Sequence, residues 1–162
     1  MGYWLAGSIL FFLAVMAGLS RRSRKTSAVG QPVGRLRPCP ESPNCVCSEE
    51  THARASVPPL VFDVDRSLAW QAAAAAVQAA GGEVVRQDHA YLHATFTTTV
   101  FRFKDDLELR MDEGRGVIHV RSASRVGYSD FGLNRRRARG LRRLFDQQLH
   151  AGRGGTSRRR AG

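Results

Sequence analysis

The sequence has few cysteines, only Cys39, Cys45 and Cys47 among 162 residues. So low a count excludes a small scaffold held together by many disulfides. The three thiols and the nearby His52 match no standard zinc-binding spacing, and we predict no metal site and no cofactor. A bridge between Cys39 and Cys45 would form only in an oxidising compartment, and a loop with free thiols is the alternative.

Charged side chains are absent from residues 1–20, and residues 3–19 are almost wholly apolar. As a helix, a segment of about twenty residues reaches roughly 30 Å, enough to cross the hydrocarbon core of a bilayer. A secretory signal peptide carries its cations before the apolar run, whereas here they follow it. The reversed order therefore predicts an uncleaved transmembrane anchor at residues 1–20. The cations that follow it are Arg21, Arg22, Arg24 and Lys25.

These cations also predict which side of the membrane the domain occupies. Lys and Arg that flank a span stay on the cytoplasmic side, so we expect a single-pass protein with its domain in the cytoplasm. An extracytoplasmic domain, left after signal cleavage, is the alternative. A Cys39–Cys45 disulfide would conflict with the cytoplasmic placement, because disulfides persist in oxidising compartments.

Acidic residues are scarce in the two flanks of the chain, and the net charge of +11 is therefore concentrated in these flanks. Residues 21–38 carry six cations and no acid, and residues 135–162 carry ten arginines against one acid. The body between them, residues 39–134, is acidic, with 9 Lys and Arg against 13 Asp and Glu. The basic flanks therefore predict attraction to anionic lipid. Aromatic residues that could stack on bases are nearly absent from the basic run, so we expect no nucleic-acid partner.

Hydrophobic periodicity predicts an α+β domain at residues 38–150, after a basic linker at residues 21–37 and before a disordered Arg/Gly tail at residues 151–162. The element order is β-α-β-β-β-β-α, which predicts a curved antiparallel sheet with both helices packed on one face. The sequence carries no indication of oligomeric state. The predicted strands are residues 60–64, 83–87, 91–100, 105–112 and 116–123, and the predicted helices are residues 66–80, capped by Asp65, and 134–149.

Alternation along the last strands predicts two unlike faces. Leu107, Leu109 and Met111 fall on one face of their strand, and Ile118 and Val120 fall on one face of the next. If these apolar faces coincide, the opposite face collects polar residues. We expect that face to be an exposed surface of Thr, acids and Arg, namely His93, Thr95, Thr97, Thr99, Asp106, Glu108, Arg110, His119 and Arg121.

Three segments carry a resemblance to a known family: CPESPNC at 39–45, FRFKDDLEL at 101–109 and IHVRSASRVGYSDFGLNRRR at 118–137. Through them, residues 38–149 resemble the domain of unknown function 1499 family. Cys47 stands where that family usually has serine. The resemblance implies no activity. It implies a shared structure around the family's recurrent residues, matched here as Asp105, Asp106, Arg121, Ser122, Ser124, Arg125, Tyr128, Asp130 and Asn134.

No catalytic triad, metal cage or phosphate-binding loop is recognisable in the sequence, so it assigns no reaction. Polar residues are densest at 116–137, and we predict that any ligand site lies where residues 121–134 meet the strand at 105–108. The candidate ligand-binding residues are Asp106, Glu108, Arg121, Ser122, Ser124, Arg125, Tyr128, Asp130 and Asn134.

Three interpretations of this cluster remain open. The acids and arginines are ordinary cross-strand ion pairs in the first. In the second, the chain is a binding module whose Arg121 and Arg125 forks hold a small anion or an acidic lipid headgroup. The third is an enzyme in which Asp106 and Glu108 form a carboxylate pair and His119 carries a proton.

Overall fold

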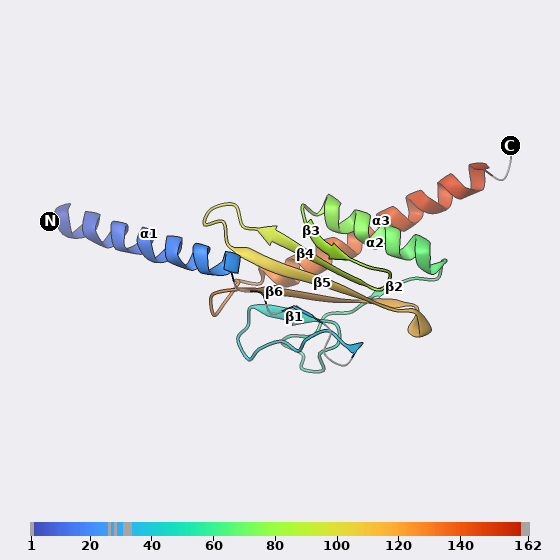
Figure 1. Ribbon diagram of the computed structural model, residues 1–162, viewed down its shortest axis with the longest axis horizontal. Helices are drawn as coiled ribbons and strands as arrows, with labels where there is room; N and C mark the ends of the chain where they lie inside the picture. Colours follow the sequence, from blue (N-terminus) through green and yellow to red (C-terminus); the bar gives the residue numbers. More distant parts are fainter. Residues whose placement is uncertain (1, 26, 28, 31–33, 160–162) are drawn as a thin grey trace.

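The computed structural model describes residues 2–25, 27, 29–30 and 34–159 (Figure 1). A long N-terminal helix leads into an open antiparallel sheet that two further helices cover on one side. The elements are α1 (Gly2–Lys25), β1 (Cys45–Cys47), β2 (Leu60–Val61), α2 (Arg66–Ala79), β3 (Glu83–Gln87), β4 (Tyr91–Thr97), β5 (Lys104–Asp112), the 3₁₀ turn η2 (Glu113–Arg115), β6 (Val117–Ser124) and α3 (Leu133–Arg159).

The sheet confirms the predicted fold class, with strand order β1-β6-β5-β4-β3 and β2 also paired to β6. All pairings between these strands are antiparallel, and β5 and β6 share the longest ladder, from Asp105↔Ser124 to Asp112↔Val117. β1 is a short edge strand in a segment that was not predicted to contain a strand. Three residues are too few to show an alternating pattern, so composition could not reveal this strand.

Helix α2 starts at the position that the sequence predicts. The Asp65 side chain accepts hydrogen bonds from the backbone N–H groups of Ser67 and Leu68, at 2.8 and 3.3 Å. Gly81 ends the helix in a left-handed conformation, with φ of 85°. A β-carbon on the next residue, Gly82, would lie 2.8 Å from the Phe96 ring, so only glycine fits where the chain turns back toward the sheet.

The core lies between the sheet and the two helices α2 and α3. The predicted apolar face of β5 and β6 is confirmed, since Leu107, Leu109 and Ile118 are fully buried there. Leu141 and Phe145 of α3 close the core from the other side and are also fully buried. The alternating pattern along the strands therefore determines which face of the sheet meets the helices.

The opposite, polar face of the sheet differs from the expectation, because it is not exposed. Asp106, Glu108 and Arg121 are only 3%, 0% and 3% exposed. The chain between α1 and β2 crosses this face, and Figure 1 shows it on the side of the sheet away from the helices. Leu36 and Cys47 of that segment form a second small apolar cluster with Tyr91 of β4. The described part of residues 27–59, namely 27, 29–30 and 34–59, is named the cover segment, and it turns a predicted surface into an interior.

Three elements end well away from their predicted ends, and the first of them is β2, which stops at Val61 instead of residue 64. β4 stops at Thr97 instead of residue 100, because the Thr98 N–H donates to the Phe103 carbonyl and turns the chain. Helix α3 continues to Arg159, so the predicted tail is helical up to that residue, and residues 160–162 lie outside the described part. Helix α3 still lies against α2 at Gly152, where an added β-carbon would be 3.0 Å from Leu68 Cδ1. Extending an existing helix also costs less than starting one.

Candidate functional site

The candidate site is a row of ion pairs on the covered face of β5 and β6. Glu108 and Arg121 are directly opposite in the ladder, and Arg121 donates to Glu108 Oε2 at 2.9 Å. The other carboxylate oxygen accepts from the Tyr91 hydroxyl and from the Gly30 backbone N–H, each at 2.7 Å. Burial and the bond to Glu108 raise the pKa of Tyr91, so its hydroxyl stays protonated as a donor. Glu108 is thus a fully bonded, buried carboxylate.

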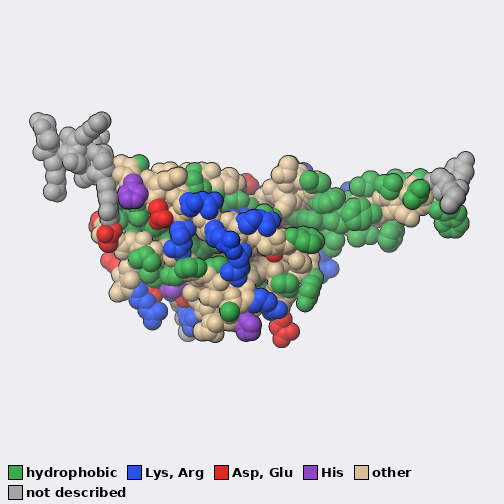
Figure 2. All heavy atoms as spheres, turned by 180° about the vertical axis from the view of Figure 1, so that it is seen from behind, with side chains coloured by type: hydrophobic (Ala, Val, Ile, Leu, Met, Phe, Trp, Pro, Cys, Tyr) green, Lys and Arg blue, Asp and Glu red, His purple; other side chains and the backbone are tan. Residues whose placement is uncertain are grey.

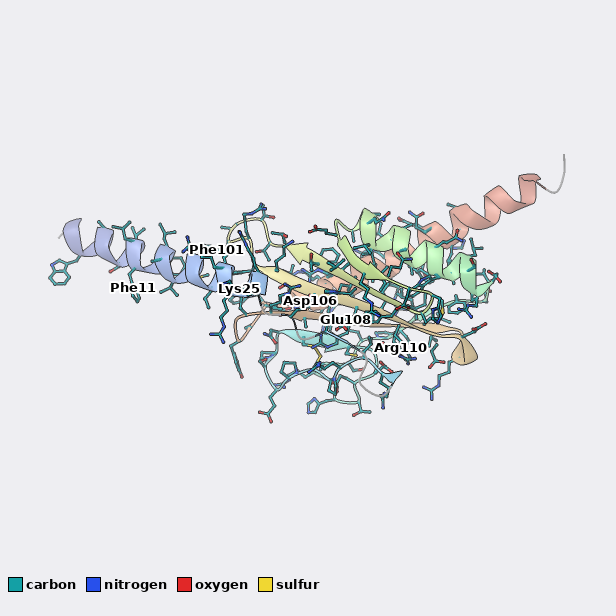
Figure 3. All side chains as sticks on the ribbon, viewed as in Figure 1. Phe11, Lys25, Phe101, Asp106, Glu108 and Arg110 are labelled. Atoms are coloured by element: carbon teal, nitrogen blue, oxygen red, sulfur yellow. A yellow bond between two sulfur atoms is a disulfide. The ribbon has the colours of Figure 1, made fainter. Side chains whose placement is uncertain are left out.

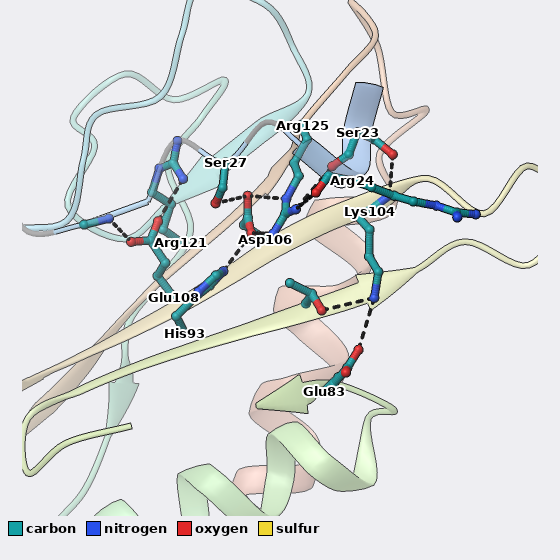
Figure 4. A network of polar contacts seen from close by, with 12 residues as sticks. Ser23, Arg24, Ser27, Glu83, His93, Lys104, Asp106, Glu108, Arg121 and Arg125 are labelled. Carbon is teal, nitrogen blue, oxygen red and sulfur yellow. Dashed lines mark hydrogen bonds and ion pairs between the residues drawn. The ribbon is translucent and has the colours of Figure 1, made fainter. Parts of the chain in front are cut away.

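Asp106 forms the second pair, one step along the same face of β5 (Figure 4). The Arg125 guanidinium donates two hydrogen bonds to its carboxylate, from Nε to Oδ2 at 3.0 Å and from a terminal nitrogen to Oδ1 at 2.7 Å. His93 Nε2 lies 2.7 Å from Oδ1, and Ser27 donates to Oδ2 at 3.2 Å. Burial opposes ionisation of Asp106, but its bonds with His93 and Arg125 outweigh that effect and hold its pKa below the usual value.

Arg125 also binds the end of helix α1. Its remaining guanidinium nitrogen donates to the carbonyls of Ser23 and Arg24, at 3.2 and 3.5 Å. Ser23 is fully buried, and its hydroxyl accepts from the Lys104 backbone N–H at 3.1 Å. The last carbonyls of a helix need partners, and here Arg125 supplies them. This role could not be predicted from the sequence, because nothing in the apolar run indicates that its end docks on the domain.

Four of the other predicted site residues belong to a separate cluster on the helix face of the sheet. Ser122 donates to Asn134 Oδ1 at 2.6 Å, and the Asn134 amide donates to Ser124 at 3.0 Å. Asp130 accepts from the Asn134 backbone N–H at 2.7 Å at the start of α3. This cluster also contains two residues outside the candidate ligand-binding set, Asp105 and Arg137, which form an ion pair at 2.7 Å.

The structure therefore divides the nine candidate residues. Asp106, Glu108, Arg121 and Arg125 lie together under the cover segment. Ser122, Ser124, Asp130 and Asn134 hold the start of α3 against β6. Tyr128 belongs to neither cluster, since its side chain is 75% exposed on the loop after β6.

A pocket of about 560 Å³ opens beside the ion pairs, between the cover segment and β6. Arg37, Arg121 and Arg125 line it together with Asp106, and the disulfide-closed loop at 39–45 forms its other wall. Arg121 Nε is buried without a hydrogen-bond partner among the described residues. A buried donor of this kind is costly unless it is bonded.

The three thiols are used structurally. Cys39 and Cys45 form a disulfide with a Cα–Cα distance of 5.6 Å, within the normal range. Cys47 is buried in β1, and burial raises its pKa to about 11, which leaves it an unreactive thiol at neutral pH. Among the described residues, no group of three or more His, Cys, Asp or Glu is placed to hold a metal ion.

His119 lies apart from Asp106 and Glu108, in a second pocket of about 570 Å³. Its Nδ1 is 3.1 Å from the Ser48 hydroxyl, and its Nε2 is 3.6 Å from Asp112. Burial, assisted by nearby Arg110, lowers the pKa of His119, so the ring is neutral near pH 7 and can accept a hydrogen bond from Ser48 in this geometry. Ser48 was not among the residues predicted from the sequence, because a lone serine in a loop carries no signal.

Comparison with known proteins identifies the family. The DUF1499 family model, described as a protein of unknown function, matches residues 35–145. The chain therefore belongs to this family, which confirms the resemblance seen in its sequence motifs. The match spans most of the cover segment, the sheet and most of the core portion of α3. No curated protein matches the chain.

Proposed function

We propose that the chain is a membrane-anchored binding module that holds a phosphate or carboxylate group in the pocket between the cover segment and β6. The observation that carries this proposal is the convergence of Arg37, Arg121 and Arg125 on one pocket, with a buried and unbonded Arg121 Nε among the described residues. Guanidinium groups bind such anions through paired N–H donors. Because Arg121 and Arg125 also bind acids, they are held rigid before a ligand arrives.

Charge balance supports an anion over a neutral ligand. Asp106 neutralises Arg125, and Glu108 neutralises Arg121. Arg37 is exposed at the mouth of the pocket and leaves one positive charge in excess. Ser27, Ser42 and Ser124 also line the wall, and the hydroxyls of Ser27 and Ser42 already donate to Asp106 and Asn44. The pocket is therefore suited to a singly charged group with several oxygen atoms.

The anion is proposed to be an acidic lipid headgroup, because the anchor would hold the pocket near the membrane. Helix α1 contains a span, Trp4–Lys25, that is long and apolar enough to cross a membrane, and within it only Ser20 and Ser23 are buried. A signal sequence has the same properties, but cleavage near residue 20 would separate Ser23, which is buried against β5, from the helix that holds it. We therefore propose an uncleaved anchor. Ser27 lines the pocket two residues beyond this helix, which brings the pocket close to the membrane surface.

Binding can be tested with the full chain in nanodiscs of neutral lipid. We expect glycerophosphoglycerol, a phosphodiester with a single negative charge, to raise the melting temperature, since a ligand of the folded state stabilises it. Arg37→Ala should abolish this shift while leaving the melting temperature without ligand unchanged. Arg139→Ala is the matched control, because it removes another exposed arginine, one that lies on α3 away from the pocket lining.

Two results would contradict the proposal: no shift with the unsubstituted chain, or an equal shift with Arg37→Ala. A parallel series in nanodiscs that contain phosphatidylglycerol separates the two sources of the anion. If the headgroup is the ligand, anionic lipid alone should raise the melting temperature, and Arg37→Ala should remove most of that increase. The arginines outside the pocket contribute a salt-sensitive background that the Arg139→Ala control measures.

A second candidate function, hydrolysis of an anionic ester, rests on the Ser48–His119–Asp112 contacts. A serine hydroxyl beside a neutral histidine is the smallest arrangement in which a base can activate a serine as a nucleophile. Arg35, Arg110 and Arg115 line the same pocket and would face a negatively charged substrate, although Glu49, Glu50 and Asp112 line it too and Glu49 pairs with Arg35 and Arg110. The carboxylate pair predicted from sequence is less suited to catalysis, because Asp106 and Glu108 are each bound to an arginine.

This candidate predicts covalent labelling of Ser48. A fluorophosphonate probe should modify the folded chain, and Ser48→Ala should lose the modification, as should His119→Gln. Ser129→Ala is the control, because that serine is exposed in another loop. Labelling that persists in Ser48→Ala, or no labelling of the unsubstituted chain, would remove the hydrolase from consideration.

A further inference from the structure

Two loops beside helix α1 expose large apolar side chains. The first, residues 98–103, carries Val100, which is 79% exposed, and the second, residues 125–132, carries Phe131, which is 88% exposed. The Phe101 ring lies 6.1 Å from Phe12 of α1, so the first loop contacts the apolar helix directly. Figure 3 shows Phe101 near the end of α1, on the same end of the domain as Lys25. Exposed apolar groups that adjoin one another on a folded domain usually mark an interaction surface.

An apolar pocket of about 530 Å³ lies between these loops and the helix. Met16 and Leu19 of α1 form one wall, and Phe103, Val126 and Leu133 of the domain form the other. Figure 2 shows hydrophobic side chains running from α1 onto the adjoining end of the domain. The membrane-spanning surface of the helix and the lining of the pocket are thus one continuous apolar surface.

The backbone holds Phe131 outward in an unfavourable conformation. Its φ of 52° lies in the left-handed region, which bulky residues rarely adopt. Asp130 fixes the loop by accepting from the Gly132 backbone N–H at 2.9 Å, and Arg136 donates to the Phe131 carbonyl at 2.9 Å. The loop is thus held in a strained conformation that leaves an aromatic ring almost wholly exposed. Strain of this kind is typical of functional positions.

Cations border the apolar surface where headgroups would lie. Arg21 and Arg24 of α1 and Arg102 of the first loop line a shallow depression together with Leu13 and Met16. Long basic side chains keep their charge at the level of the headgroups while their stems cover apolar surface. Apolar loops with a cationic border, placed where a membrane helix enters the domain, match the layers of a bilayer interface.

We propose that the loops at 98–103 and 125–132 are inserted in the bilayer interface, and that a lipid acyl chain fills the pocket between them and α1. The inference rests on the membrane anchor of the proposed function but not on its anion pocket. The partner is lipid because the surface is continuous with α1, which exposes its apolar residues along nearly its whole length. Insertion also removes Val100 and Phe131 from water, which the isolated domain fails to do.

Quenching of tryptophan fluorescence by brominated lipid tests this placement in the full chain. The chain is reconstituted in nanodiscs of phosphatidylcholine brominated in the upper part of its acyl chains. In a Trp4→Phe background, Phe131→Trp and Val100→Trp each place an indole at the proposed interface. Val61→Trp is the control, because Val61 is also exposed but pairs with Val117 beside η2, at the opposite end of the sheet from α1. The native Trp70 is buried in the core and gives a constant background.

We expect brominated lipid to quench the indoles introduced by Phe131→Trp and Val100→Trp, and to leave the one introduced by Val61→Trp unchanged. The unsubstituted chain reports separately on the anchor, because Trp4 lies in α1 and should itself be quenched. Quenching of Trp4 without quenching at positions 100 and 131 would overturn the inference while leaving the anchor in place.

Discussion

Replacing Arg121 with methionine is expected to lower the free energy of unfolding by about 3–5 kcal/mol, one of the largest effects that a single substitution can have in this domain. Methionine keeps much of the volume and leaves Glu108, which is fully buried, without its charged partner. The bonds from Tyr91 and Gly30 remain, but neither carries a charge. The measurement is chemical denaturation of the full chain in detergent, followed by circular dichroism.

A double variant separates the lost pair from lost packing. Glu108→Gln combined with Arg121→Met removes both charges, so it should recover a substantial part of the stability that Arg121→Met alone loses. Arg66→Met is the matched control, because Arg66 pairs with Glu113 at 2.7 Å on the surface, where both side chains are exposed. We expect that substitution to cost no more than about 1 kcal/mol. If Arg66→Met and Arg121→Met cost the same, the buried row of ion pairs does not stabilise the fold as proposed.

The face of the sheet that meets the helices could be predicted from the sequence, because successive side chains of a strand point to opposite faces. Leu107 and Leu109 are two residues apart, and so are Ile118 and Val120, and the ladder places both apolar sets on the helix face. The same rule placed Glu108 and Arg121 together on the other face. These pairings depend only on local periodicity and on the short η2 turn that joins β5 to β6.

Burial of the polar face could not be predicted, because it depends on a segment without periodicity. Residues 34–59 contain one strand of three residues and otherwise loops and turns, so the sequence shows no element that could act as a layer. The contacts of the cover segment are individual ones, such as Gly30 N–H to Glu108 and Ser48 to His119. Such contacts join positions about 70 residues apart or more, and no local pattern encodes them.

The division of the candidate site was encoded in the sequence, although it was not recognised there. Arg121 and Ser122 are neighbours in β6, so their side chains point to opposite faces of the sheet. Asp105 and Asp106 diverge in the same way on β5, toward Arg137 and Arg125 respectively. A continuous run of polar residues along a strand is therefore divided between the two faces of the sheet. For this reason, the number of polar residues in a stretch of sequence overestimates how many of them lie together in one site.

Charge and disulfide chemistry make opposite predictions for the side of the membrane that the domain occupies. The cations after the apolar span favour the cytoplasm. The Cys39–Cys45 bridge favours an oxidising compartment instead. The bridge closes the loop that lines the anion pocket, so it belongs to the proposed site. We propose, on this ground, that the domain lies outside the cytoplasm and remains attached through α1.

The number of free thiols in cells is expected to depend on the compartment of the domain, either one with the disulfide formed or three without it. The reagent is a maleimide coupled to a polymer, which reacts with free thiols, and it is added to denatured protein. If the domain lies in an oxidising compartment, one cysteine, Cys47, should be modified before reduction and all three after it. A cytoplasmic domain would offer three thiols without reduction, because reducing systems there keep cysteines unpaired. Denaturation is needed in both arms because Cys47 is buried in the folded chain. The combined variant Cys39→Ser/Cys45→Ser is the control, with one modification under either condition. Three modifications before reduction would restore the cytoplasmic orientation that the flanking cations predict.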